Sequence, residues 1–172
     1  MNANTQSIPF DPDALGRKYQ EERDKRVRAD GNDQYQEVTG EFAYFVEDPY
    51  IDSELKRDAI EDEVEVVIIG GGFGGMLAAA RLHDVGITDF RIVEKGGDFG
   101  GTWYWNRYPG ASCDIESYVY FPLLEKTGFV PKQKYTNAPE TLEYCHVIAK
   151  TYGLHERALM PTMVTPTDWD EE

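Results

Sequence analysis

The sequence is short of cysteine, of basic residues and of long apolar runs. Its only cysteines, Cys113 and Cys145, form no CxxC pair, so we expect free thiols and a cytoplasmic protein. Lysine and arginine total 17 against 32 acidic residues, and a net charge of −15 disfavours nucleic acids and membrane surfaces as partners. No apolar run approaches the roughly 20 residues that cross a bilayer, and the amino terminus lacks the pattern of a signal peptide.

Composition divides the chain near residue 60. Residues 1–60 are polar and charged, and residues 13–30 predict a helix with a thin apolar stripe, suited to lying on another surface. A solvated, loosely docked arm is the alternative interpretation of the same composition. From Val64 the chain alternates strand and helix patterns. We therefore predict a mostly helical or irregular extension over residues 1–60 and an incomplete α/β domain over residues 61–172.

The first half of that domain has the pattern of one βαβ unit. Val64–Gly70 is β-branched and almost continuously apolar, which is typical of a strand buried on both faces of a parallel sheet. A glycine run follows. The stretch Met76–Gly86 then predicts a helix that ends just before Gly86, and Phe90–Lys95 predicts a second strand. This order predicts a right-handed crossover between parallel strands.

Two further elements are predicted in the second half of the domain. Residues 137–153 predict a helix, with Asn137 as N-cap and Glu140 three residues later, as in a capping box. A strand is expected to begin at Met160.

The histidines have no metal-ligand spacing, so we expect no metal site.

The glycine run matches the dinucleotide-binding pattern GxGxxG at Gly70, Gly72 and Gly75. The first glycine permits the sharp turn out of the strand, the second leaves room for a pyrophosphate, and the third permits close packing of helix on strand. The helix N-terminus offers free N–H groups to the phosphates. Glu94, at the end of the second strand, is placed to accept hydrogen bonds from an adenosine ribose. Together these features predict a dinucleotide site.

The choice between FAD and NAD(P) depends on the segment after Glu94. A nicotinamide-binding domain is expected to continue with another helix and strand, whereas this chain continues KGGDFGGTWYWNRYPGASCD. Its glycines can pass close to a pyrophosphate and a ribityl chain, and its aromatic side chains can wall the planar isoalloxazine of FAD. The alternative is that these aromatics, Trp103, Tyr104, Trp105 and Tyr108, are core or interface residues.

The motifs VVIIGGGFGG, EK and GGTWYWNRYPGASCDIES resemble the N-terminal FAD-binding segment of Baeyer–Villiger monooxygenases, which are class B flavoproteins. The resemblance covers about residues 62–165 and is strong between Val64 and Tyr120. Flavin-containing monooxygenases and N-hydroxylating enzymes share the glycine motif, but the TWYWNRYPGxxCD run is closer to the Baeyer–Villiger group. The polar arm resembles the N-terminal extension of the subgroup acting on large ketones. A Rossmann-like, three-layer FAD-binding domain, present in part, is thereby implied.

The resemblance implies FAD and NADPH as cofactors, and an O2-dependent conversion of a ketone to an ester or lactone through a C4a-peroxyflavin. It makes Asp114, near the flavin and the nicotinamide, the candidate catalytic residue; a turn or cap role is the alternative. Ser112 departs from the arginine that the family often has there, so the usual NADP contact is not implied. Val164 is implied to be a strand residue whose backbone meets the adenine. The cofactor-binding residues that the resemblance implies are Gly70, Gly72, Phe73, Gly75, Glu94, Lys95, Gly101, Thr102, Trp103, Trp105, Ser112, Cys113, Asp114, Tyr120 and Val164.

The family's chemistry also uses parts that these 172 residues lack. They are a second glycine turn for NADPH, a linker of the type FxGxxxHxxxW, and an active-site arginine. We therefore expect the N-terminal portion of an enzyme, inactive without the missing C-terminal half or a second chain that supplies it. The alternatives are an N- or S-oxygenating flavoprotein and a non-catalytic FAD-binding fragment.

Overall fold

The structure is a computed structural model that describes residues 10–36, 38–51, 57–165 and 167–170. The chain divides into two compact units, Met1–Glu47 and Asp48–Glu172. The second unit contains the sheet and begins before residue 60, because residues 48–51 pack against the loop that follows the second strand. The domain boundary near residue 60 stays a prediction.

The first unit is helical, as expected. It contains α1 (Pro12–Asp24) and two 3-10 helices, η1 (Gly31–Gln34) and η2 (Gly40–Val46). The side chain of Asp11 caps α1 by accepting the Asp13 N–H at 2.9 Å. The helix ends earlier than the predicted stretch of residues 13–30, and none of its described residues is buried.

Three parallel strands form the sheet of the second unit, in the order β1 (Val66–Ile69), β2 (Phe90–Val93) and β3 (Ala158–Leu159). The predicted βαβ unit and its parallel strands are confirmed. The strand expected from Met160 is wrong, because β3 ends at Leu159 and the chain leaves the sheet at Pro161, which has no N–H to donate to a strand ladder.

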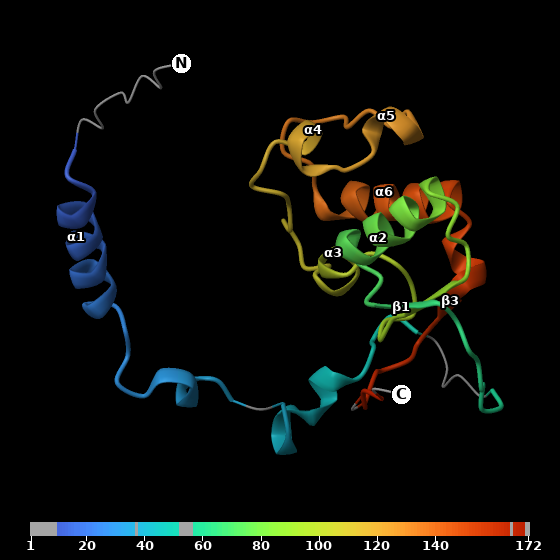
Figure 1. Cartoon of the computed structure of the whole chain (residues 1–172), viewed down its shortest axis with the longest axis horizontal. Coiled ribbons are helices and arrows are strands. Elements are labelled where there is room, and N and C mark those ends of the chain that lie inside the picture. Colours follow the sequence, from blue (N-terminus) through green and yellow to red (C-terminus); the bar gives the residue numbers. More distant parts are fainter. Residues whose placement is uncertain (1–9, 37, 52–56, 166, 171–172) are drawn as a thin grey trace. The chain divides into compact units, whose positions relative to one another are not determined.

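Two helices, α2 (Phe73–Asp84) and α6 (Ala138–Thr151), lie on the same face of the sheet (Figure 1). Phe90 and Ile92 of β2 are buried beneath them. The expectation that the first strand is buried on both faces is wrong for the described chain, in which Val67 and Ile69 are 57% and 64% exposed. The reason is that both long helices cover one face, so β1 alternates between buried and open positions.

The ends of the two helices follow from their sequences. Gly86 follows α2 with φ +85°, the left-handed conformation predicted for it. Asn137 caps α6 as predicted, and its side chain accepts the Glu140 N–H at 3.1 Å. The capping box is incomplete, because the Glu140 carboxylate accepts the Lys132 N–H instead. In the described part of the chain, no helix combines the length and apolar character that crossing a bilayer requires.

Short helices fill the connection between β2 and β3. They are α3 (Thr102–Trp105), α4 (Ser117–Tyr120) and α5 (Leu124–Thr127) before α6, and the 3-10 helix η3 (Leu154–Arg157) after it. The helix α3 packs on α6, and η3 packs on β2. The segment predicted to carry the cofactor therefore packs on α6 through α3.

Candidate functional site

The first glycine turn joins β1 to α2. Gly70 has φ +99°, which permits the sharp turn, and its N–H donates to the carbonyl of Val93 at 2.8 Å. Gly72 is the N-cap of α2 and supplies no side-chain hydrogen bond, and no acidic residue lies in the first turn. The first N–H groups of a helix have no partners within it. The N-terminus of α2 therefore presents donors and partial positive charge without a competing carboxylate.

Close packing explains the last glycine of this turn. A Cβ atom on Gly75 would lie 1.9 Å from the carbonyl oxygen of Gly70, which real contacts never allow. The backbones of β1 and α2 thus approach each other at this point, as the glycine pattern predicts.

The Glu94 carboxylate ties two loops together. The side chain is only 6% exposed, and its two oxygens accept the Gly71 N–H at 2.5 Å and the Gly96 N–H at 2.6 Å. Each carboxylate oxygen can accept a second hydrogen bond, so both retain capacity for a ligand hydroxyl. The adjacent Lys95 is exposed, and its Nζ lies 5.5 Å from the centroid of the Trp105 ring.

The second glycine turn lies directly against the first. The Gly100 N–H donates to the carbonyl of Gly71 at 3.0 Å. Gly101 has φ +53°, and a Cβ atom on it would lie 2.7 Å from the Cα of Gly72. The two turns, Gly70–Gly75 and Gly96–Gly101, therefore form one cradle of stacked backbone. We call this arrangement the glycine cradle.

The aromatic residues after the cradle divide into two groups. Trp103 is 7% exposed, and its indole N–H donates to the Tyr120 hydroxyl at 3.0 Å, while Phe73 packs edge-on against the Tyr120 ring. Burial raises the pKa of Tyr120, so its hydroxyl stays protonated at neutral pH. Tyr104 is also buried, whereas Trp105 is half-buried. The core interpretation thus describes Trp103 and Tyr104, and Trp105 remains accessible.

The segment that carries Asp114 is fixed to the start of α6. The Cys113 N–H donates to the carbonyl of Thr136 at 2.9 Å, and Ser112 pairs with Asn137 in an isolated β-bridge. Cys113 is buried, whereas Ser112 and Asp114 are exposed. The backbone here is held in place while the Asp114 carboxylate is accessible.

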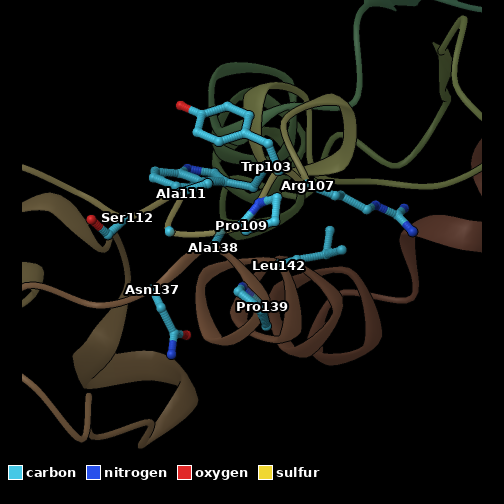
Figure 2. A pocket seen from close by; sticks show the side chains of 11 residues that line it. Trp103, Arg107, Pro109, Ala111, Ser112, Asn137, Ala138, Pro139 and Leu142 are labelled. Atoms are coloured by element: carbon cyan, nitrogen blue, oxygen red, sulfur yellow. The ribbon is translucent and has the colours of Figure 1, made fainter.

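A pocket of about 510 Å³ opens beside the cradle. Trp103 and Pro109 form one wall, and Pro139 and Leu142 of α6 form the other (Figure 2). Of the predicted site residues only Trp103 and Ser112 line it, so the glycine cradle does not form its wall. The pocket is a neighbour of the predicted cofactor site.

Two further predicted residues, Thr102 and Val164, differ in how exposed they are. Thr102 is exposed at the start of α3. Val164 is half-buried and lies outside the sheet, so the strand position expected for it is wrong. The nearby Thr162 N–H donates to the carbonyl of Glu94 at 2.7 Å. This bond holds the C-terminal segment beside the end of β2.

A second cluster, around Asp98, has no counterpart among the sequence motifs. The Asp98 carboxylate lies 2.9 Å from Nε2 of His155 and 3.3 Å from Nε2 of His146. Asp98 and His155 are 57 residues apart, so no local spacing predicts the contact. Across the described residues no group of three or more His, Cys, Asp or Glu side chains is arranged to hold a metal ion.

Known proteins resemble this chain over its glycine-turn region and over nearly its whole length. A family model described as an NAD(P)-binding Rossmann-like domain matches residues 68–127. Baeyer-Villiger monooxygenase ATR8 from Stachybotrys chlorohalonatus is 48% identical over 169 residues, which cover 98% of this chain and 27% of that protein.

Solved structures of monooxygenases also resemble this chain. Polycyclic ketone monooxygenase from the thermophilic fungus Thermothelomyces thermophila matches with a TM-score of 0.70 at 43% identity, over 86% of this chain and 25% of that one. OTEMO in complex with FAD and NADP matches with a TM-score of 0.60 at 30% identity, over 65% of this chain and 22% of that one. The predicted Rossmann-like fold, present in part, and the resemblance seen in the sequence are confirmed, while the described residues form only two of the three expected layers. The chain spans about a quarter of the length of these relatives.

Proposed function

Because this chain is a relative of Baeyer–Villiger monooxygenases over nearly its whole length, we propose that it forms the FAD-binding part of such an enzyme. The enzyme would oxidise a ketone to an ester or lactone with NADPH and O2. The observation that carries the proposal is the glycine cradle, in which two backbone turns stack at the N-terminus of α2 with the Glu94 carboxylate at their base.

The cradle fits the adenosine diphosphate part of FAD. A diphosphate needs N–H donors and positive potential, and α2 offers both through a glycine N-cap and a first turn without acidic residues. A ribose needs an acceptor for its hydroxyls, and the Glu94 oxygens retain one acceptor position each. Around Gly70 and Gly74 no atom lies within 4 Å of a built Cβ, so the backbone is open to a ligand.

When bound, FAD supplies the chemistry that protein side chains lack, accepting hydride from NADPH and reacting with O2. The chain's own residues would place it. Thr102 and Trp105 are accessible beside the cradle, and we assign them to the flavin ring. We assign Asp114, which is exposed on a fixed backbone segment, to contacts with the flavin and the nicotinamide amide. We also assign Val164 and Tyr120 to contacts with the cofactor.

The first test is FAD binding by the chain itself, measured by quenching of flavin fluorescence. We expect binding that ADP competes away, because the cradle holds the ADP part. Gly74→Asp places a carboxylate in the first turn of α2 at a position with open space, so it should weaken FAD binding about tenfold, or about 1.4 kcal/mol, without destabilising the protein. The isosteric Gly74→Asn is the matched control and should leave binding nearly unchanged. Equal affinities of the Asp and Asn variants would contradict the assigned phosphate position.

The second test addresses the reaction. The chain replaces the matching quarter of the polycyclic ketone monooxygenase, and the chimaera is supplied with NADPH, O2 and a cyclic ketone. We expect a product that is one oxygen atom heavier and has the ester infrared band of a lactone. A chimaera that binds FAD and oxidises thioethers or amines but not ketones would overturn the Baeyer–Villiger assignment. That result would favour the N- or S-oxygenating alternative.

A further inference from the structure

A short segment of the second unit, Asp48–Ile51, contacts the loop that carries the second glycine turn. Oδ2 of Asp48 accepts the Gly97 N–H at 2.8 Å and the Tyr104 hydroxyl at 2.6 Å. The other oxygen, Oδ1, accepts the Tyr50 N–H at 2.9 Å and closes the local Asp-Pro-Tyr turn. One carboxylate thus joins a segment before the sheet to a loop about 50 residues later.

The loop backbone at Gly96 and Gly97 lies very close to the side chains of Ile51 and Tyr104. A Cβ atom on Gly97 would lie 2.9 Å from Cγ2 of Ile51 and 2.9 Å from the Tyr104 hydroxyl. A Cβ atom on Gly96 would lie 2.8 Å from Cε1 of Tyr104. A side chain at either position would therefore displace Ile51 or Tyr104, whatever ligand the loop meets.

Arg107 extends the same contact to the end of α3. Its guanidinium carbon lies 3.8 Å from the centroid of the Tyr50 ring and 4.6 Å from that of Tyr104. Its Nε donates to the carbonyl of Tyr104 at 2.9 Å. A cation between two aromatic faces is a stabilising arrangement, and here it links Tyr50 to α3.

These contacts lead directly to the glycine cradle. Gly96, next to the residue that Asp48 holds, donates its N–H to Glu94. Tyr104 lies in α3, whose N-cap is Gly101, the residue stacked on Gly72. The loop is thus held by Asp48 in its first half and stacked on the first turn in its second half.

We propose that Asp48 is a positioning residue of the FAD site, acting through Gly97 and Tyr104 to hold the second glycine turn in the conformation that receives the cofactor. This inference rests on the proposed function. It assigns a role at the cofactor site to Asp48, a residue outside the motifs by which that site was predicted. In this role Asp48 would act without touching the cofactor or the substrate.

Burial and the Asp48 carboxylate together raise the pKa of Tyr104 to about 12. The phenol therefore stays protonated at neutral pH and is available as the donor to Asp48. The pairing of a carboxylate with two donors is a charge-assisted contact, stronger than a neutral hydrogen bond.

Asp48→Asn separates the loop contact from the local turn. The amide oxygen of the substituted side chain can still accept the Tyr50 N–H, whereas its NH2 group, in the place of Oδ2, can accept neither the Gly97 N–H nor the hydroxyl proton of Tyr104. Asp58→Asn is the matched control, because it makes the same charge change at an exposed position. Tyr104→Phe and the double variant complete a cycle that measures the coupling of the two side chains.

Three measurements on the 172-residue chain test the proposal. They are amide hydrogen exchange of residues 96–105 without FAD, FAD affinity by fluorescence, and the urea unfolding midpoint. If Asp48→Asn leaves the loop in its binding conformation a tenth of the time, the FAD dissociation constant rises about tenfold. We expect this rise together with faster exchange confined to the loop, and we expect neither in Asp58→Asn.

The outcomes separate this proposal from the proposed function. Absence of FAD binding in the unmodified chain would overturn the proposed function and, with it, a role at an FAD site. Equal FAD affinity in the unmodified chain and Asp48→Asn would overturn the positioning role alone, whether or not loop exchange increased. A fall in the urea midpoint with exchange accelerated across the whole second unit would also overturn it, because Asp48 would then be a general structural residue.

Discussion

Replacing Glu94 by alanine should destabilise the protein even in the absence of any cofactor. The side chain is buried, and both of its oxygens accept backbone N–H groups, from Gly71 and Gly96. A hydrogen bond to a charged group contributes roughly 1.5–3 kcal/mol, so two bonds give about 3–6 kcal/mol. Removal of the carboxylate also removes its desolvation cost, which places the expected loss near the lower end, about 3 kcal/mol.

The assay is urea unfolding of the cofactor-free chain, followed by circular dichroism. With a slope of about 2 kcal/mol per molar urea, a loss of about 3 kcal/mol lowers the midpoint by about 1.5 M. Glu143→Ala, at an exposed position on α6, is the control and should shift the midpoint little. An unchanged midpoint for Glu94→Ala would refute the energetic role given to the two bonds. The measurement matters for function, because a weaker FAD affinity of Glu94→Ala would combine the loss of the proposed ribose contact with the loosening of the cradle.

Three further predictions use the same unfolding and reactivity measurements. Gly75→Ala forces a Cβ to within 1.9 Å of the Gly70 oxygen and should cost about 3 kcal/mol or more, whereas Gly74→Ala, in open space, should stabilise α2 by about 0.5–1 kcal/mol. The pKa of Tyr104, raised to about 12 by burial and by Asp48, lies above the value near 10 of an unfolded tyrosine, so the stability it contributes is complete below pH 10 and is lost as pH rises through about 12. The urea midpoint should therefore fall more steeply between pH 10 and 12 in the unmodified chain than in Tyr104→Phe. Burial raises the pKa of Cys145 to about 12, so this thiol should react with Ellman's reagent at pH 8 only after denaturant is added.

Much of the fold is predictable because local pattern and tertiary structure agree. The β-branched run before Gly70, the glycines and the capped helix at Asn137 each encode one element by themselves. Prediction fails where a distant part of the chain decides the outcome. Val67 and Ile69 are apolar enough for a strand buried on both faces, yet the described helices cover only one face.

The strand expected from Met160 shows the same limit. Its composition suits a strand, but pairing with β2 ends at Leu159, because Pro161 has no N–H to donate and the carbonyl of Glu94, just past β2, accepts the Thr162 N–H instead. The strand position expected for Val164 is wrong for the same reason. A register of this kind depends on hydrogen bonds between residues about 70 apart, which no local periodicity contains.

Only the glycine turn and Glu94 of the candidate site carry a pattern that the sequence alone reveals. GxGxxG followed by an acidic residue at the end of the next strand is a recurring pattern of dinucleotide sites, so the sequence alone identifies it. Asp48 and Tyr104 meet across 56 residues through a side-chain contact that no ligand imposes. The only local sign of Asp48 is an Asp-Pro pair, which predicts a turn and nothing about the partner of its carboxylate.

The glycines of the cradle show why a glycine-rich motif overstates the role of the ligand. Gly75 is required by the Gly70 carbonyl, and a side chain at Gly97 would displace Ile51 or Tyr104, so the fold itself disfavours a side chain at both positions even in a protein that bound nothing. Gly74 has open space around it, and no contact within the described chain demands the absence of a side chain there. Substitution at Gly97 therefore tests the architecture of the cradle, whereas a charged side chain at Gly74 tests the ligand. Cofactor recognition in this chain is best measured at the glycine that the fold itself does not need.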